Sequence, residues 1–430
     1  MNKKRIIILI GKIIGVILLS LVLLIAGIYL YLNSKNLKEL PKPMGNYTVG
    51  ITHLDFTDID RKEIFDKTKD SYREIPVTIF YPADNDEGKS SAPYATPEAL
   101  KMMSKLTSGL WNKNMSKLKT HVYEDVKISN NKDNYPVIIF NHGYASYEMQ
   151  NTVLCSDLAS YGYIVISIGH PYESTAVKYT DGRIIEMPES RIEKFMGKGA
   201  FSKEYNSFLM KLLRQSKKEV CTDAEAMEVA EYLFQENNEF LTNNLHIWVQ
   251  DTIFIANQLE DLNNGIINSI FKGKLNLSLG LGITGHSYGG ATATQTCLID
   301  DRFVAGINID GGDYGDYLYK DIKTPFMILG SEIIDWASRS AYIYNSQDAY
   351  RVIVTGTEHW GFTDVVFSSK QAHIGSKIGK REMYEFREIV TKYNLMFFEK
   401  YLLKNDSVDL RDIKYKDIRF HEKKSKESDM

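Results

Sequence analysis

A serine between two glycines is the most chemically informative feature of the sequence. The segment Gly285-His-Ser287-Tyr-Gly289 follows the short apolar run 281–284 and precedes a stretch compatible with a helix. This G-x-S-x-G pattern predicts a sharp strand-to-helix turn that strains the serine and lifts its hydroxyl above the edge of a sheet. A side chain at Gly285 or Gly289 would collide with the neighbouring strand or helix. We therefore expect Ser287 to be a nucleophile rather than part of an ordinary glycine-rich turn.

A nucleophilic serine needs a base that takes its proton and an acid that orients the base. With this kind of turn, the chain order is serine, then Asp or Glu, then histidine. His359, His373 and His421 all follow the serine by enough residues to fold back. His359 comes just after the last predicted strand, in a loop with glycines on both sides, so we assign it as the base.

Two other histidines lie beside predicted strands. His286 precedes the serine directly, but adjacent residues at such a turn point apart, so a structural role is predicted. His170 ends an earlier strand and is followed by Pro171. We interpret it as a hydrogen-bonded histidine at a strand end.

Two carboxylates compete for the place of the acid. Asp310 ends the first predicted strand after the serine, and Asp335 follows the next strand, where many α/β hydrolases keep their acid. Both loops lie on the sheet edge that bears the serine, so these arguments leave both open. Asp313 and Asp316 follow Asp310 at three-residue intervals, which does not fit a calcium loop. They are predicted to be solvated.

Attack by such a serine on an acyl carbonyl also needs backbone N–H donors for the oxyanion of the tetrahedral intermediate. One donor is expected to be the amide of Tyr288, directly after the nucleophile, and the other should come from a loop after an early strand. Pro136 to Tyr144 supplies such a loop. There Gly143 would let the backbone approach a substrate and the Tyr144 amide would donate. A plain β-turn is the alternative.

Short apolar runs alternate with longer helical stretches through the body, which favours an α/β fold around a largely parallel sheet. The predicted strands are Ile75 to Tyr81, Val137 to Phe140, Ile164 to Ile168, Leu281 to Thr284, Val304 to Ile309, Phe326 to Gly330 and Arg351 to Thr355.

Between residues 186 and 264 the sequence contains no convincing strand and predicts three helices. The first has an apolar face that includes Phe208 and Leu212. The second opens with a capping-box pattern formed by Thr222 and Glu225. The third covers 247–262. A helical insertion at about 186–245 either caps the active site or simply flanks the sheet.

The N-terminus carries an uncharged, mostly apolar run from Ile13 to Leu32, long enough as a helix to cross a bilayer. We divide the chain into a cytoplasmic tip and membrane anchor at 1–35, a linker at 36–44, a catalytic domain at 45–415 and a polar tail at 416–430. Cations before the helix predict a single-pass cell-membrane protein with a cytoplasmic N-terminus and an extracytoplasmic catalytic domain. A cleaved signal peptide is the rival interpretation, but the run is too long for one.

The composition excludes several classes of protein. The 430 residues are 43% hydrophobic and 25% charged, with a formal net charge of -3. A largely disordered chain is therefore ruled out, and no basic surplus indicates nucleic acid as a partner. Three cysteines cannot form a disulfide framework. We expect Cys155, Cys221 and Cys297 to be buried thiols.

Several segments together resemble a known family. They are Phe140-Asn-His-Gly-Tyr144, Asp157-Leu-Ala-Ser-Tyr-Gly-Tyr-Ile-Val165, Gly285-His-Ser-Tyr-Gly-Gly-Ala-Thr292, Asp301-Arg-Phe303 leading to Gly306-Ile-Asn-Ile-Asp310, and His359 followed by Phe362 and Asp364. Over about 47–403 the chain resembles the secreted platelet-activating factor acetylhydrolases, or lipoprotein-associated phospholipases, which are α/β hydrolases. The chain differs in its anchor, in Asn141 where serine is usual, and in Gly311-Gly312 where bulky residues follow the acid.

The resemblance implies a site and a substrate class. It favours Asp310 over Asp335 as the acid, implies that no metal or other cofactor is needed, and implies cleavage of short or oxidised sn-2 acyl chains from phospholipids. Our hypothesis is a serine ester hydrolase with Ser287, His359 and Asp310 as its triad. The alternatives are a broad carboxylesterase or cutinase-like polyester hydrolase, and a catalytically silent extracytoplasmic binding module. The Lys, Ile and Asn richness suggests a bacterial source; the oligomeric state stays open.

Overall fold

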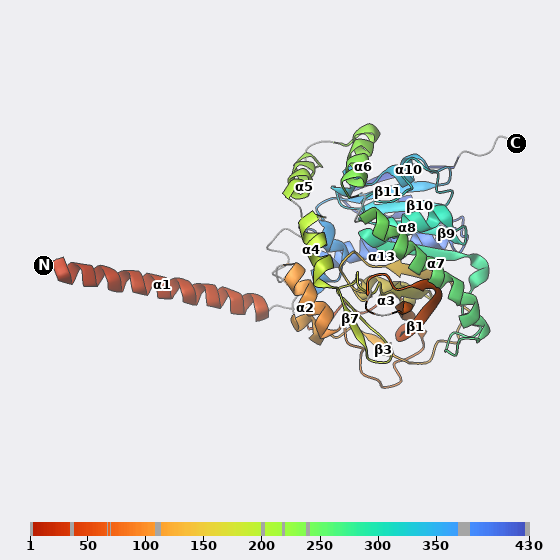
Figure 1. Cartoon of the computed structure of the whole chain (residues 1–430), viewed down its shortest axis with the longest axis horizontal. Helices are drawn as coiled ribbons and strands as arrows, with labels where there is room; N and C mark the ends of the chain where they lie inside the picture. Colours follow the sequence, from red (N-terminus) through yellow and green to blue (C-terminus); the bar gives the residue numbers. More distant parts are fainter. Residues whose placement is uncertain are drawn as a thin grey trace.

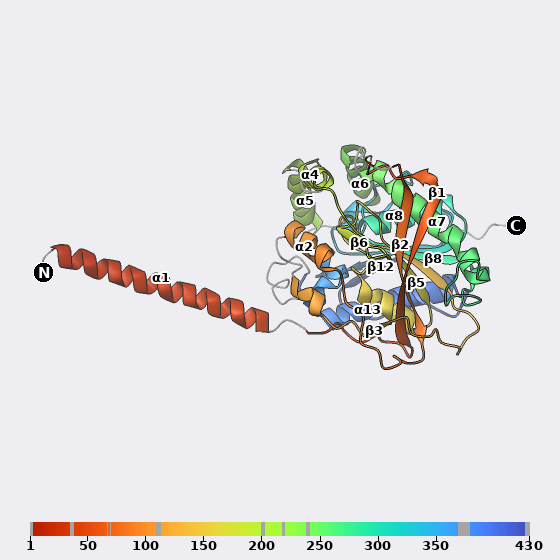
Figure 2. The same cartoon turned by 60° about the horizontal axis from the view of Figure 1, so that its bottom comes forward.

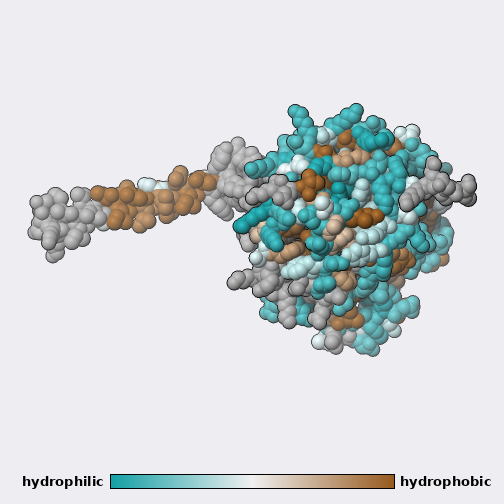
Figure 3. Space-filling model, turned by 90° about the horizontal axis from the view of Figure 1, so that it is seen from above, coloured by the Kyte–Doolittle hydropathy of each residue, from teal (hydrophilic) through white to brown (hydrophobic). Residues whose placement is uncertain are grey.

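The computed structural model describes residues 3–34, 38–66, 68, 70–107, 113–198, 203–216, 220–237, 241–368 and 379–425. A long helix, α1 (Lys3–Ser34), projects from a rounded body (Figure 1). Its stretch Gly11–Ile28 is long and apolar enough to cross a membrane, and none of it is buried against the body. Figure 3 shows this apolar band beside a body whose visible surface is mostly polar. The predicted apolar N-terminal helix is thus present.

Within the described residues, ten strands form one sheet in the order β12-β11-β10-β9-β8-β4-β5-β2-β1-β3. They are β1 (Thr48–Lys62), β2 (Tyr72–Ala83), β3 (Val122–Glu124), β4 (Val137–Asn141), β5 (Ile164–Ile168), β8 (Leu281–His286), β9 (Phe303–Ile309), β10 (Phe326–Gly330), β11 (Ala349–Val354) and β12 (Ile418–Lys423). A separate hairpin pairs β6 (Ala176–Lys178) with β7 (Ile184–Glu186).

The six strands from β5 to β11 in this order run parallel, whereas β2, β1 and β12 pair antiparallel at the two sides. The largely parallel sheet that the sequence predicts is confirmed, and all seven predicted strands are present. Because the parallel strands share one carboxyl edge, the loops after β4, β8, β9 and β11 meet there.

The sheet extends beyond the expected strands on both sides. Residues 418–423, which the sequence places in a polar tail, form β12 and pair with β11. An edge strand needs apolar side chains on one face only, and Ile418 and Phe420 supply them. The expected linker is also partly packed: Leu40 is buried and its N–H donates to the Lys119 carbonyl at 2.8 Å.

Helices cover both faces of the sheet. Along β4, Val137 and Ile139 face one apolar core, and Ile138 and Phe140 face the other, as strand geometry requires. The first core includes α7 (Asn243–Asn264) and α8 (Tyr288–Ile299), and the second includes α3 (Thr152–Ser160) and α13 (Met383–Tyr401). The shorter helices are η1 (Lys113–Lys117), η3 (Leu277–Leu279), α9 (Ile334–Ala337), α10 (Ser340–Ile343), η4 (His359–Phe362), α11 (Val365–Ser368) and η5 (Leu410–Asp412).

Three further helices form the insertion: α4 (Glu189–Lys198), α5 (Lys203–Ser216) and α6 (Asp223–Asn237). Both Figure 1 and Figure 2 show them together on one side of the body, with α2 (Pro97–Leu106) next to α4. With α7, the described residues of the segment form four helices where the sequence predicted three. The predicted capping box is confirmed, because the Thr222 amide donates to Glu225 at 2.8 Å and the Glu225 amide donates to the Thr222 hydroxyl at 3.3 Å.

Candidate active site

Ser287 occupies the turn between β8 and α8 in a strained backbone conformation. Its φ of 57° lies in the left-handed region, which a residue with a side chain seldom adopts. The end of β9 holds the turn in place, because the Ser287 amide donates to the Ile309 carbonyl at 2.7 Å. A Cβ on Gly285 would overlap the Gly289 carbonyl oxygen, and a Cβ on Gly289 would overlap that of Asn141. Both glycines therefore permit a close backbone approach.

His359 begins η4 after β11, and Asp310 follows β9 directly. His359 Nδ1 lies 2.7 Å from Asp310 Oδ2, and the other carboxylate oxygen accepts the Ser331 amide at 2.6 Å. The Asp310 side chain is fully buried, whereas the His359 side chain is 37% exposed. Burial alone would raise the pKa of Asp310, but the hydrogen bond and charge of His359 outweigh it and hold that pKa below its ordinary value. The carboxylate is thus kept ionised against the imidazole.

The neighbouring histidines make structural contacts. His286 is buried, its Nε2 lies 3.2 Å from the His359 carbonyl oxygen, and burial lowers its pKa to about 3. His170 Nδ1 lies 2.9 Å from Asp251 Oδ2, and its Nε2 lies 3.0 Å from Asn141 Oδ1. The prediction of a hydrogen-bonded His170 at a strand end is confirmed. Asn141, the unusual residue before His142-Gly143, therefore belongs to a buried polar network.

The loop after β4 lies against the serine turn. A Cβ on Gly143 would stand 3.3 Å from Ser287 Cβ, and the Gly143 amide donates to Gln150 Oε1 at 2.8 Å. On the other side of the serine, Tyr288 is the first residue of α8, so its amide has no acceptor one turn earlier within the helix. Tyr144 and Tyr288 contact each other, with ring centroids 5.3 Å apart.

A cavity of about 320 Å³ opens above these residues. Ser287, His359, Asp310, Tyr144 and Tyr288 all line it. Most of the remaining wall is apolar. Helix α2 and the three insertion helices contribute Met103, Leu106, Phe195, Phe208, Met210, Leu212 and Leu233 to it. The insertion therefore covers the site, and the cavity offers an acyl chain an apolar surface.

Asp335 lies apart from this group. Its side chain is buried and forms ion pairs with Arg339 at 3.0 Å, Arg351 at 3.3 Å and Arg419 at 3.5 Å. The prediction that Asp313 is solvated is wrong, because it is fully buried and accepts the amides of Arg339 and Ser340 at 3.0 and 3.1 Å. Burial raises its pKa to about 6. The three cysteines are free and buried, as predicted.

A buried charged cluster beneath the loop after β4 was not anticipated. Arg73, with 2% of its side chain exposed, contacts Asp251 Oδ2 at 2.8 Å and Glu63 at 3.0 Å. One signal for it exists in the sequence: Asp251 shares the apolar face of its helix with Trp248 and Ile255. Among the described residues, no group of three His, Cys, Asp or Glu side chains could hold a metal ion.

Comparisons with known proteins identify the fold and similar proteins. A solved structure of a ferulic acid esterase from Streptomyces cinnamoneus superimposes with a TM-score of 0.64 at 20% identity, over 89% of this chain and 99% of that one, which confirms the α/β-hydrolase fold. The platelet-activating factor acetylhydrolase of Bos taurus is 25% identical over 382 residues, 85% of this chain and 77% of its own. The enzyme of the same name from Cavia porcellus is 26% identical over 381 residues, 84% and 78% respectively.

The profile of a single family spans nearly the whole body. It is described as platelet-activating factor acetylhydrolase, isoform II, and matches residues 32–417. That range contains the serine turn, the His359–Asp310 pair and the insertion that covers the cavity. The chain is a carboxylic ester hydrolase and belongs to the platelet-activating factor acetylhydrolase, isoform II, family.

Proposed function

We propose that Ser287, His359 and Asp310 form a catalytic triad that hydrolyses lipid esters through an acyl-enzyme. The observation that carries this proposal is the 2.7 Å contact between His359 Nδ1 and the buried Asp310 carboxylate, on the wall of the cavity that Ser287 also lines. This contact fixes the imidazole tautomer whose Nε2 can accept the serine proton. Asp310 then stabilises the imidazolium that forms.

The reaction proceeds in two halves. Ser287 Oγ attacks the acyl carbonyl while His359 takes its proton, and the amides of Tyr144 and Tyr288 bind the oxyanion. His359 then protonates the leaving alcohol, which departs and leaves an acyl-enzyme. Water, deprotonated by the same histidine, releases the acid. The loss of one oxyanion donor typically lowers the rate about 100 to 1,000-fold.

The substrates in this proposal are phospholipids with a short or oxidised acyl chain, or related lipid esters. The apolar insertion helices around the cavity suit an acyl chain, and the cavity of about 320 Å³ limits the length of that chain. The acetylhydrolase names of the two relatives point to a short acyl group. A broad carboxylesterase would instead accept simple esters and phospholipids equally.

The proposed location is the membrane, with α1 as a single-pass anchor and the catalytic body on the extracytoplasmic side. The length and apolar surface of α1 support this, as do the cations that precede the apolar stretch. A body held at a lipid surface would meet lipid esters at high local concentration.

A fluorophosphonate probe tests the triad directly. The wild-type protein should be labelled, and Ser287→Ala should lose both the label and about a millionfold in kcat. Ser278→Ala, which removes an exposed hydroxyl bonded to Asn276, is the matched control and should behave as wild type. Folded wild-type protein that takes no label would instead indicate a silent binding module.

Graded substrates then test the chemistry of the acyl group. We expect kcat/KM for p-nitrophenyl esters to fall steeply once the chain exceeds what the cavity holds, and short-acyl phospholipids to exceed simple esters of equal chain length. Equal rates on both, with no dependence on chain length, would favour the broad carboxylesterase.

A further inference from the structure

We propose that Arg191, on the insertion helix α4, is a positioning residue that holds the oxyanion loop in place through its contacts with Glu173 and Tyr144. This inference rests on the proposed function, because it assigns a purpose to the Tyr144 amide. We define the oxyanion loop here as residues 143–146.

Glu173 is the fixed end of this arrangement. Its side chain is fully buried; one carboxylate oxygen accepts a hydrogen bond from Arg191 Nη2, and the other accepts Trp248 Nε1 at 2.9 Å. The preceding residue, Tyr172, has a strained φ of 66°. Strain of this kind persists only where the surroundings enforce it. The backbone therefore presents Glu173 to Arg191 in a defined geometry.

The same segment holds the oxyanion loop by its backbone. The Ala145 amide donates to the Glu173 carbonyl at 3.1 Å, and the Thr175 amide donates to the Ser146 carbonyl at 2.7 Å. Ala145 itself has a positive φ of 53°. Two backbone hydrogen bonds thus hold the part of the loop that directly follows Tyr144.

Arg191 contacts the loop through the side chain of Tyr144. The Nη2 atom that bonds Glu173 also lies 3.0 Å from the Tyr144 hydroxyl. Phe195, one helical turn further along α4, packs its ring against Tyr144 with centroids 5.0 Å apart. Two side chains of one insertion helix therefore meet the residue whose amide we assign to the oxyanion. The seating of α4 and the position of that amide are coupled.

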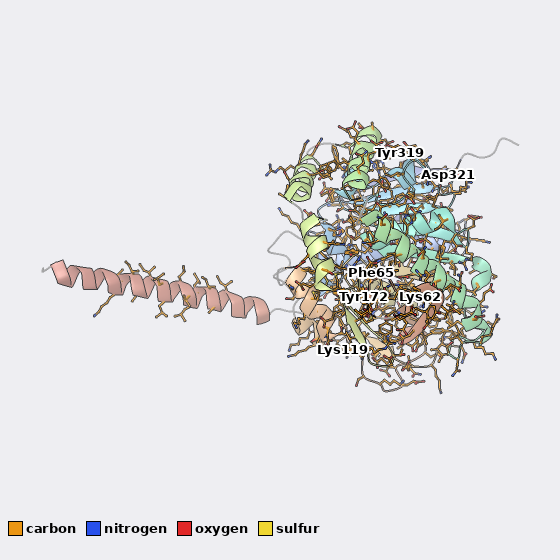
Figure 4. All side chains as sticks on the ribbon, in the orientation of Figure 1. Lys62, Phe65, Lys119, Tyr172, Tyr319 and Asp321 are labelled. Atoms are coloured by element: carbon orange, nitrogen blue, oxygen red, sulfur yellow. The ribbon has the colours of Figure 1, made fainter. Side chains whose placement is uncertain are left out.

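Outside the ion pair, Arg191 is shielded from water. Its guanidinium lies 4.2 Å from the centroid of the Phe65 ring, and only 14% of its side chain is exposed. Phe65 in turn contacts Tyr172, with centroids 6.0 Å apart, and Figure 4 labels both near the lower end of α4. A planar guanidinium can stack flat on a ring while one of its nitrogens bonds two oxygens, whereas the compact ammonium group of a lysine has no plane with which to stack.

Loss of Arg191 should leave the protein folded. Burial raises the pKa of Glu173 to about 7, and the charges of Arg191 and Arg73 act against that rise. Without Arg191 the carboxyl would shift further toward its neutral form, so no unpaired buried charge would remain at neutral pH. An Arg191 variant can therefore report on catalysis rather than on unfolding.

The test compares Arg191→Met and Arg191→Lys with Arg183→Met, an exposed arginine of the β6–β7 hairpin whose side chain is 51% exposed. We expect Arg191→Met to lower kcat about 100-fold with little change in KM, because a misplaced oxyanion donor weakens the transition state more than substrate binding. The kcat of Arg191→Lys should lie between those of Arg191→Met and wild type. Arg183→Met should match wild type.

Hydrogen exchange supplies a measurement that does not depend on activity. The amide hydrogens of peptides that cover residues 143–146 and α4 should exchange faster in Arg191→Met than in wild type. In Arg183→Met their exchange rate should equal that of wild type. Wild-type kcat in Arg191→Met, or unchanged exchange of the loop, overturns the positioning role while the Ser287→Ala result still stands. Full activity in Ser287→Ala would overturn the proposed triad instead, and with it the catalytic purpose assigned to Arg191.

Discussion

The segments that follow β9 and β10 each carry a buried carboxylate, and the two carboxylates have opposite surroundings. Asp310, after β9, faces one imidazole and one backbone amide, and its histidine partner is partly open to the cavity. Asp335, after β10, is surrounded by three guanidinium groups, and in the described part of the chain it contacts no group on the cavity wall that could carry a proton. Both side chains are buried, so burial alone does not distinguish them.

The difference lies in what each carboxylate can change during a reaction. Asp310 can orient an imidazole and stabilise its cation as a proton moves. Arginines stay protonated throughout, so the charge around Asp335 is constant. Asp335, in α9, instead connects this helix to the start of α10, to β11 and to β12, through Arg339, Arg351 and Arg419 respectively. The surroundings of Asp310 suit proton transfer at an imidazole, whereas those of Asp335 hold neighbouring elements together.

Turnover should separate the two carboxylates most strongly. Asp310→Asn should lower kcat about 10,000-fold, because the amide no longer fixes the tautomer of His359 or stabilises its cation. Asp335→Asn should keep most of its activity. Steady-state ester hydrolysis on folded protein measures both. The reverse pattern would show that Asp335 is the acid and that the proposed triad is wrong.

Stability should rank the two variants in the opposite order. Asp335→Asn removes the buried carboxylate that faces Arg339 and Arg351 and leaves them only the exposed carboxylate of Asp223 among the carboxylates that the structure describes. The free energy of unfolding should therefore fall by about 3–5 kcal/mol. Asp310→Asn should lose only about 1–2 kcal/mol, because His359 is partly exposed and can exchange its lost partner for water. Urea unfolding followed by circular dichroism provides the comparison. Equal losses of unfolding free energy would mean that both carboxylates contribute equally to the stability of the fold.

The two glycines after Asp310 allow a test of how tightly this segment packs against the serine turn. A Cβ on Gly311 would overlap the Ser287 carbonyl oxygen, whereas a Cβ on Gly312 would meet only the outer ring atoms of Tyr314, which can turn away. Gly311→Ala should therefore lose about 1–3 kcal/mol of stability and part of its activity, and Gly312→Ala very little. Thermal unfolding and kcat of the two variants check this. An equally mild Gly311→Ala would mean that the serine turn adapts easily.

The smallest effect concerns a histidine beside the site. Burial lowers the pKa of His286 to about 3, so between pH 6.5 and 3 the unfolded chain binds a proton at this position that the folded chain does not. Its contribution to stability is therefore present above pH 6.5 and lost as the pH falls. The stability difference between wild type and His286→Gln should change by about 1.4 kcal/mol per pH unit below 6.5 and stay constant above it. Denaturant titrations at pH 5 and 7.5 measure this, and a difference that does not vary with pH would contradict it.

The sequence predicted the structural features that depend on residues close together in the chain. The apolar runs located the central strands, and the glycines around Ser287 located the turn, because both signals are local. The choice between Asp310 and Asp335 depends on which side chains face each carboxylate. Those partners come from distant segments of the chain, so only the family resemblance favoured one of them.

Contacts over long sequence distances account for the errors. Asp313 caps the start of α10 from 26 and 27 residues away, so no local pattern revealed that it is buried. The same applies to Glu173, in the turn before β6, and Arg191, in α4. The strand β12 is short and polar on one face, so it resembled a tail until β11 provided its partner.

The spacing between α1 and the body has a further consequence. The helix ends at Ser34, and Leu40 is already buried against the body. Six residue steps span at most about 20 Å. With α1 in a bilayer, the enzyme would sample a thin layer in which lateral diffusion, rather than bulk dilution, sets how often a substrate arrives. Release of the body by cleavage within this segment would make turnover depend on the volume of the surrounding solution.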